Sequence, residues 1–227
     1  MALDHKEEQY GDTYQSLLMA YAFGVLDRAQ SLVVAAHLTL SPKARALTQA
    51  CEHLAGALLE KDCPPAPMSL SAKDRIMAAI TADICPNKAC SDYNCQNLPE
   101  ELGNLPHPLQ EPMQGCTSFT WNSVGKGFAA YDIALGDCAS KARFMKVNPG
   151  LKTPEHCHGG LEITLVLNGA VIENGALYRR GDLLVADETI THSSQACPQA
   201  GCVCMVVTSA PIKLTGIKSL LNPFLKF

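Results

Sequence analysis

Four residues in the second half of the chain have the types and spacing of metal ligands. His156, His158 and Glu162 form a His-x-His-x3-Glu pattern, and His192 follows thirty residues later. Alternate residues of a strand share a face, so His156 and His158 are expected to point the same way, and Glu162 has the same parity. Three neutral imidazoles and one carboxylate suit zinc, iron, nickel, copper or manganese. We therefore predict a site for one divalent metal ion.

A chance grouping of two surface histidines near a glutamate is the competing interpretation, and a His-x-His pair alone does not exclude it. The full spacing is more specific, because Gly181-Asp182 and His192 follow in a segment rich in strand-forming residues. We expect this segment to fold back, so that the distant histidine reaches the other three ligands.

The eleven cysteines offer further donor atoms. A disulfide framework is not expected, because their number is odd and no secretory signal precedes them. Cys85, Cys90 and Cys95 follow one another at five-residue steps, which is not a standard zinc spacing. We interpret them as free thiols and keep a zinc site with Cys63 or His107 as the alternative.

Three other cysteines belong to predicted strands of the second half of the chain. Cys202 and Cys204 share one face of a predicted strand, where disulfide geometry is rare, so we interpret them as small core residues. A redox-active pair near the metal is the alternative. Cys157 lies between two predicted ligands and is expected to point away from the metal.

The elements that must position these residues are predicted to be strands. Segments rich in β-branched and aromatic residues recur through residues 116–227. The pairs Asn168-Gly169 and Asn174-Gly175 predict tight turns, because both residue types tolerate positive φ. Many short strands with frequent turns are typical of an all-β barrel or sandwich.

Residues 1–84 are predicted to form a helical bundle, since their apolar residues recur at helical spacing. Candidate N-caps precede the predicted helices: Asp12, Asp27, Ser41 and Ser71. The prolines after Cys63 are expected to end the third helix, because proline lacks an amide proton. Residues 85–115 are rich in Pro, Asn and Cys, and we interpret them as a linker. The predicted fold class is therefore α+β, with an all-α domain before an all-β domain.

Composition excludes two classes of partner from our expectations. The net charge of −4 offers no electrostatic basis for direct nucleic-acid binding. The sequence contains no run of about 18 apolar residues, so no membrane-spanning helix is expected. The charged N-terminus differs from a secretory signal, so we expect a cytoplasmic protein.

The second half resembles a cupin barrel (double-stranded β-helix). The resemblance rests on these motifs: Pro149-Gly150, His-x-His-x3-Glu, Val166-Leu167-Asn168-Gly169, Arg180-Gly181-Asp182 and His192. Gly201-Cys202-Val203-Cys204 and Ala210-Pro211 are similar to the cupin of the ChrR family of anti-sigma factors. In that family three histidines and one glutamate bind zinc in this order. The resemblance thus implies one zinc on His156, His158, Glu162 and His192, with iron, nickel and manganese as alternatives.

The first half resembles the zinc-binding anti-sigma domain of the same family, through residues 17–24, 31–38 and 56–60. The His-x3-Cys-x2-Cys motif of that domain is altered here, because Ser41 and Ala44 follow His37 at the cysteine positions. Its N-terminal histidine position falls on Asp12, with His5 nearby. We expect this domain to fold without metal and His37 to be a packed or capping residue.

The resemblance implies an anti-sigma factor without catalytic residues. Its helical domain would bind an alternative sigma factor of the ECF type, and its cupin would sense a signal; a homodimer is compatible with this assignment. The residues alone favour a cupin metalloenzyme such as a dioxygenase, because the same ligands can hold iron with open positions. A metal-binding sensor without a sigma partner is the third interpretation.

Overall fold

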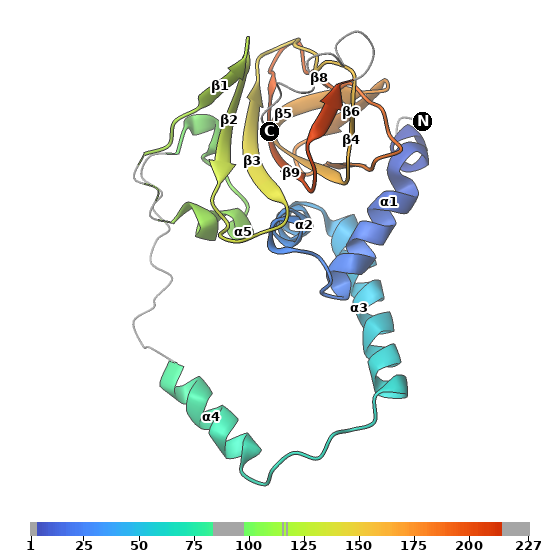
Figure 1. The fold of residues 1–227 in the computed structure, drawn as a ribbon, viewed down its shortest axis with the longest axis vertical. Coiled ribbons are helices and arrows are strands. Elements are labelled where there is room, and N and C mark those ends of the chain that lie inside the picture. Colours follow the sequence, from blue (N-terminus) through green and yellow to red (C-terminus); the bar gives the residue numbers. More distant parts are fainter. Residues whose placement is uncertain (1–3, 84–97, 115, 117, 215–227) are drawn as a thin grey trace.

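The computed structural model describes residues 4–83, 98–114, 116 and 118–214. Its longer helices are α1 (Asp4–Ala22), α2 (Arg28–Leu40), α3 (Pro42–Asp62) and α4 (Ala72–Asp83), followed by the short η1 (Glu100–Leu102), α5 (His107–Gln110) and η2 (Glu111–Met113). Its strands are β1 (Asn122–Gly125), β2 (Phe128–Ile133), β3 (Lys141–Val147), β4 (His156–His158), β5 (Glu162–Glu173), β6 (Ala176–Arg179), β7 (Leu183–Ala186), β8 (Gln195–Ala196), β9 (Cys202–Thr208) and β10 (Ile212–Leu214). The predicted α+β fold class is confirmed (Figure 1).

The strands form an antiparallel barrel around β5, the longest strand of the described chain. The main sheet has the order β1-β2-β3-β9-β5-β6, and β7 and β8 also pair with β5, while β4 and β10 form a separate two-stranded sheet. In its first half β5 pairs with β7 on one side and β9 on the other. Its second half pairs with β6 through the turn at Asn174-Gly175.

The part of this sheet formed by β5, β7 and β9 is buried on both faces. Along β7, Leu183 and Val185 belong to one apolar core, and Leu184 and Ala186 belong to another. Successive side chains of a strand point to opposite faces, so the two cores lie on the two sides of the sheet. The second core fills the barrel interior, and the first lies between the sheet and the helices.

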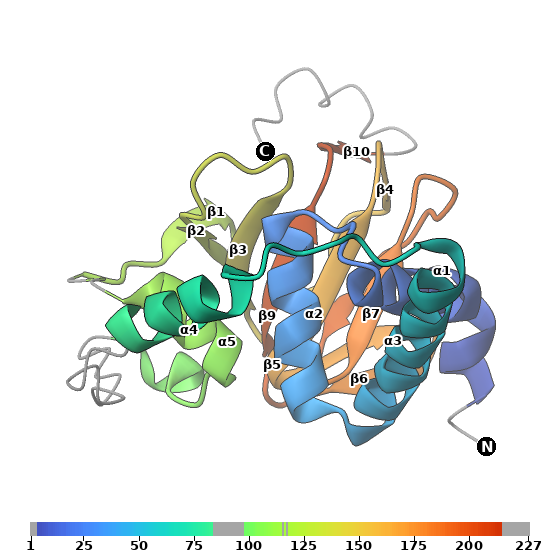
Figure 2. The ribbon, with the colours of Figure 1, turned by 90° about the horizontal axis from the view of Figure 1, so that it is seen from below.

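Helices cover the outer face of the barrel. Figure 2 shows α2 lying across β9 and β5, with α1 and α3 beside it. Buried side chains of the first two helices, among them Leu18, Val33 and Val34, share one core with Phe144 and Met205 of the sheet. The helices therefore pack against the barrel and not only against one another.

Residues 98–113 contribute to that shared core. Leu102, Leu105, Leu109 and Met113 are all buried there, although this segment falls within the predicted linker 85–115. Short helices with isolated apolar residues lack a clear period, which is why the sequence pattern did not reveal them. Residues 84–97 lie outside the described part of the chain, and the predicted boundaries 1–84, 85–115 and 116–227 stay a prediction.

Local signals predicted most helix starts correctly. Asp27 and Gln30 form a capping box, and Ser41 caps α3 with Pro42 at its first position. The predicted start at Asp12 is wrong, because α1 begins at Asp4. An aspartate three residues before a glutamine also occurs within helices, so that pair alone does not mark a helix start.

The two Asn-Gly pairs have different outcomes. Asn174 and Gly175 both have positive φ and join β5 to β6, as predicted. The turn predicted at Asn168-Gly169 is wrong, because both residues lie within β5 beside a β-bulge between Val166 and Asn168. Gly169 has a φ of +68°, and a Cβ atom there would lie 2.2 Å from the Gly201 carbonyl oxygen.

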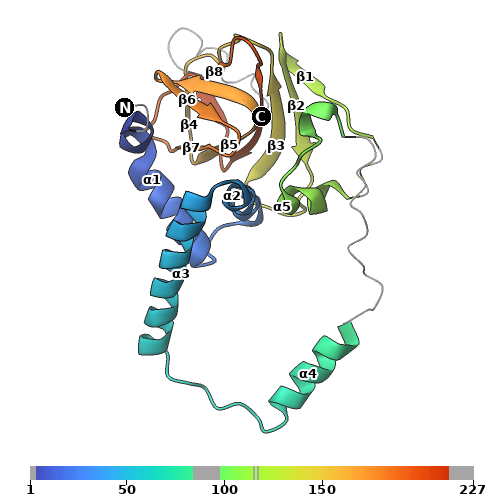
Figure 3. The ribbon, with the colours of Figure 1, turned by 180° about the vertical axis from the view of Figure 1, so that it is seen from behind.

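The end of α3 and all of α4 project from the body of the protein (Figures 1 and 3). Their apolar side chains are exposed: Leu54, Leu58, Leu59, Ile76, Met77 and Ile80, together with Met68 and Leu70 between the helices. Within the described residues, no helix is both long and apolar enough to span a bilayer.

His37 of α2 connects α1 with the barrel at the interface between the helices and the barrel. It is 3% exposed, its Nδ1 lies 2.8 Å from the Gly181 carbonyl oxygen, and its Nε2 lies 2.9 Å from the Tyr14 hydroxyl. The carbonyl can only accept, so Nδ1 donates and Nε2 accepts from Tyr14. His37 is thus a packed residue, as predicted, and both ring nitrogens are satisfied in the neutral form.

Replacing His37 by Ala is expected to lower the free energy of unfolding of the full-length chain by about 2–4 kcal/mol. The substitution creates a cavity and leaves the Tyr14 hydroxyl and the Gly181 carbonyl without this partner. Urea unfolding followed by circular dichroism measures the loss. The matched control is His53→Ala, because His53 is exposed on α3, and its effect should stay within about 0.5 kcal/mol.

Burial also lowers the pKa of His37, although the Gly181 hydrogen bond and the charge of Asp182 oppose it. A histidine whose folded pKa is depressed binds its proton more readily when unfolded, so its contribution to stability falls below pH ~6.5. The stability difference between wild type and His37→Gln should therefore shrink between pH 7.5 and pH 5. A difference that is independent of pH would contradict this protonation state.

Candidate metal centre

Short strands and a glycine turn bring the first three predicted ligands together. β4 pairs with β10 so that Cys157 lies opposite Lys213, and His156 and His158 point to the other side, where both are buried. Gly160 follows, where a Cβ atom would lie 2.5 Å from the Ser209 hydroxyl oxygen, so a side chain does not fit without a shift. This tight turn places Glu162 at the first position of β5, facing the two histidines.

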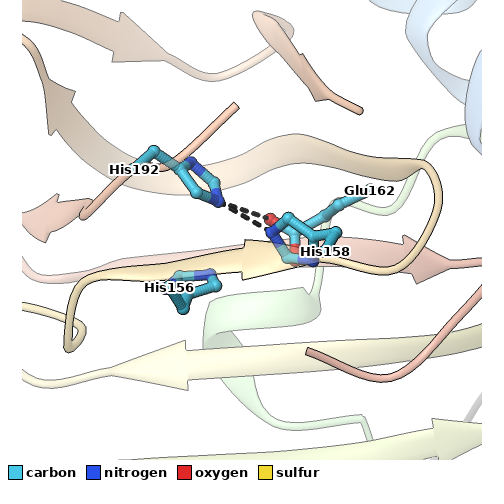
Figure 4. Close-up of side chains that lie close together, drawn as sticks. All are labelled: His156, His158, Glu162 and His192. Atoms are coloured by element: carbon cyan, nitrogen blue, oxygen red, sulfur yellow. Dashed lines mark hydrogen bonds and ion pairs between the residues drawn. The ribbon is translucent and has the colours of Figure 1, made fainter. Parts of the chain in front are cut away.

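His192 reaches the same place through the backbone. Its N–H donates to the His156 carbonyl and its own carbonyl accepts from the His156 N–H, both at 3.0 Å. This isolated bridge sets the two rings 4.5 Å apart. The fold therefore brings together all four residues predicted from the sequence (Figure 4).

The donor atoms of the four side chains converge. The Nε2 atoms of His158 and His192 are 2.8 Å apart, and Glu162 oxygens lie 3.5 Å from the former and 3.9 Å from the latter. All four donor atoms lie within 4.8 Å of one another. Ligands bound to one ion at ~2 Å are ~3–4 Å apart. The cluster thus has the dimensions of a mononuclear site.

Hydrogen bonds at the far side of two rings indicate which nitrogen carries the proton. Nδ1 of His156 lies 2.8 Å from the Pro154 carbonyl oxygen, and Nδ1 of His192 lies 3.1 Å from a Glu173 carboxylate oxygen. A carbonyl and a carboxylate only accept, so both Nδ1 atoms carry hydrogen. The Nε2 atoms of these two rings then present lone pairs, which is the form that binds a metal cation.

The environment also favours a cation. Burial lowers the pKa of His158 to about 3, with the charges of His156 and His192 adding, and burial lowers the pKa of His156. Burial and the charge of Glu173 raise the pKa of Glu162 to about 7, although His192 opposes this. Burial would lower the pKa of His192, but Glu173 and Glu162 outweigh it. The neutral imidazoles of His156 and His158, beside the carboxylates that attract positive charge to His192, suit a divalent ion.

Glu173 was not predicted from the sequence. It is 1% exposed and lies at the end of β5. By parity it should face away from Glu162, since the two positions differ by an odd number of residues. The bulge at Leu167 adds one residue and reverses the alternation, so that Val171 joins Val166 in the interior core. The available signal was a glutamate in an apolar strand directly before an Asn-Gly turn.

The cysteines are placed as follows. Cys157 is half-buried on the face of β4 opposite the histidines, as predicted, and Cys202 and Cys204 are buried in the interior core as free thiols. The thiol of Cys202 hydrogen-bonds with that of Cys204. Cys85, Cys90 and Cys95 lie outside the described residues.

The fold and the cluster together define a cupin with a candidate metal centre, covered on one face by helices. Residues 110–211 match the family described as the ChrR cupin-like domain. The chain is 30% identical over 215 residues to the anti-sigma-E factor ChrR of Cereibacter sphaeroides, covering 93% of this chain and 95% of that protein. The chain therefore belongs to the ChrR family of anti-sigma factors.

A solved structure agrees with this assignment. The crystal structure of Rhodobacter sphaeroides SigE in complex with the anti-sigma ChrR matches with a TM-score of 0.64 and 29% identity. The match covers 86% of this chain and 96% of that chain. It extends well beyond the cupin, so the helices that cover the barrel belong to the resemblance.

Replacing His156 and His158 together by Ala is expected to abolish stoichiometric binding of a divalent metal, because it removes two of four converging donors. Metal content after dialysis, measured by inductively coupled plasma mass spectrometry, tests this. Cys157→Ser is the matched control in the same strand and should keep one metal per chain. Full metal content in the double variant would place the ion elsewhere.

Proposed function

We propose that this protein is an anti-sigma factor that binds an alternative sigma factor of the ECF type through its N-terminal helices. The observation that carries this proposal is the similarity to anti-sigma-E factor ChrR across 93% of the chain. It is supported by the complex of SigE with ChrR, which matches over 86% of the chain. Such a partner would place the protein in the cytoplasm.

The surface offered to the sigma factor is apolar and projects from the barrel. Leu54 and Leu58 are 49% and 44% exposed and share one face of α3, four residues apart. Ile76 and Ile80 are 50% and 51% exposed and share one face of α4. Exposed apolar patches of this kind mark protein interfaces, whose centres need desolvated side chains.

The helices that form the proposed sigma-binding surface are ordered although the family's zinc ligands are absent. In the position of one cysteine Ser41 caps α3, and His37 bonds Tyr14 and the barrel instead of a metal. Structural zinc contributes folding energy, which packing can also supply. We infer that the apolar core shared by the helices and the barrel orders α1–α3 in place of zinc. Residues 1–84 remain the proposed sigma-binding domain.

The cupin is proposed to hold one divalent ion, with zinc as the assigned metal, on His156, His158, Glu162 and His192. Zinc is assigned from the family, since the donor set also suits iron, nickel and manganese. When bound, the ion would supply a Lewis-acidic centre able to take an extra ligand. His156 and His192 are joined by backbone hydrogen bonds, so a change at one ligand shifts the other.

A route from the cupin to the helices exists in the sheet between them. On β7, Leu184 and Ala186 face the interior core, and Leu183 and Val185 face the helices. Close-packed interiors transmit displacements because they have few voids. A ligand or modification at the metal centre would release the sigma factor only by favouring the released state, as any linked equilibrium requires.

Replacing Leu54 and Leu58 together by Asp should weaken binding to the cognate sigma factor by about 30-fold or more, the effect of losing a single interface hot spot. Binding of the full-length chain to purified sigma factors of its host, measured by surface plasmon resonance, tests this. The matched control is Val124→Asp, because Val124 is 43% exposed on β1, away from α3.

Equal losses in both variants would contradict the assigned surface. Wild-type protein that binds none of the host's sigma factors would contradict the anti-sigma function itself. Transcription by the sigma-loaded polymerase gives a second measurement, in which the double variant should fail to inhibit.

A further inference from the structure

The carboxylate of Glu173 is buried in the barrel interior and is not one of the four predicted ligands. Burying a carboxylate is costly unless its oxygens are paired, and an apolar residue of similar size often serves the fold as well. The surrounding core is apolar, with Val171, Tyr178 and Ala196 among its members. A glutamate at this place therefore calls for a specific partner.

Each carboxylate oxygen of Glu173 has a hydrogen-bond partner. Oε1 accepts from Nδ1 of His192 at 3.1 Å, and Oε2 accepts from the Ser194 hydroxyl. Ser194 is held in turn by Thr153, whose hydroxyl accepts from the Ser194 N–H at 2.9 Å and whose own N–H donates to the Ser194 carbonyl at 2.9 Å. The carboxylate is thus fixed by a chain of contacts that ends in backbone atoms.

The position of Glu173 relative to His192 defines what it can do. It contacts Nδ1, whereas Nε2 of the same ring faces His158 and Glu162. Glu173 therefore lies behind the ring, on the side away from the cluster. Because an ionised carboxylate only accepts hydrogen bonds, it holds the proton on Nδ1 and leaves the Nε2 lone pair directed at the cluster.

We propose that Glu173 is a positioning residue for the metal centre, which orients His192 and balances the charge of the ion. The inference rests on the proposed metal site. With Glu162 it gives two negative charges beside three neutral imidazoles, so a divalent ion would be neutralised within an apolar barrel. Partners of this kind typically change metal affinity about 10- to 100-fold when removed.

The test compares zinc affinity in full-length Glu173→Gln and Glu173→Ala with the wild type, by competition with a chromophoric chelator at pH 7.5. Gln keeps the volume and one acceptor but loses the charge, so we expect about 10-fold weaker binding; Ala loses both, so we expect about 100-fold. Glu188→Gln is the control, since Glu188 is exposed on the loop before His192. It should bind zinc as the wild type does.

A second readout separates positioning from a purely structural role. The visible absorption spectrum of the Co²⁺-loaded protein reports the ligand field, and it should change in Glu173→Gln and stay unchanged in Glu188→Gln. Weaker binding with an altered spectrum supports the inference. Wild-type affinity and spectrum in both Glu173 variants, with only the metal-free protein destabilised, would overturn it.

Ser194→Ala keeps the test valid if the Glu173 variants do not fold. It removes one contact that holds the carboxylate without removing its charge, so a smaller loss of zinc affinity in the same direction is expected. Wild-type zinc affinity in Ser194→Ala would then count against the inference. Wild-type protein that binds no zinc, cobalt, iron, nickel or manganese would contradict the metal site itself and this inference with it.

Discussion

A sheet with two buried faces is the constraint on which the rest of the structure depends. β5, β7 and β9 supply apolar side chains to the barrel interior on one face and to the helical layer on the other. Since a strand alternates its side chains, each residue serves one core only, and the apolar side chains of the outer face are buried because the helices cover them. The helices are therefore part of the barrel's stability.

This shared core explains how the helices can be ordered where the family's zinc ligands have been replaced. Hydrogen bonds tie them to the barrel at separate points: His37 to Gly181, Asp27 to the Ser140 N–H and Arg28 to the Leu135 carbonyl. Asp27 also caps α2, and its hydrogen bonds lower the pKa of its carboxyl although burial opposes this. Packing and capping thus act where a metal would otherwise fix the chain.

The metal centre uses the other face of the same sheet. Glu162 begins β5, Glu173 ends it, and the histidines approach from β4 and from the segment before β8. Hydrogen bonds behind the rings of His156 and His192 direct their lone pairs inward. The inner face of the sheet therefore holds the metal centre, and its outer face holds the helices, of which α3 extends away from the barrel to the proposed partner-binding surface (Figure 1).

The sequence by itself determined what depends on neighbouring residues. The spacing of His156, His158 and Glu162, the caps at Asp27 and Ser41 and the turn at Asn174-Gly175 are local, because a few consecutive residues specify each. His192 was predicted as the fourth ligand because a strand-rich segment thirty residues long can fold back, and the family motifs agreed with that prediction. These residues predicted the fold class and the four members of the cluster.

Only the tertiary structure decided the rest. The bulge at Leu167 depends on pairing with β9, and it turns Asn168-Gly169 into part of a strand and aims Glu173 inward. Residues 98–113 are ordered by the core they enter and not by their own pattern. Side chains along a strand alternate between the two faces of the sheet. One inserted residue, specified by pairing with a distant strand, therefore reverses the face on which every later side chain of the strand lies.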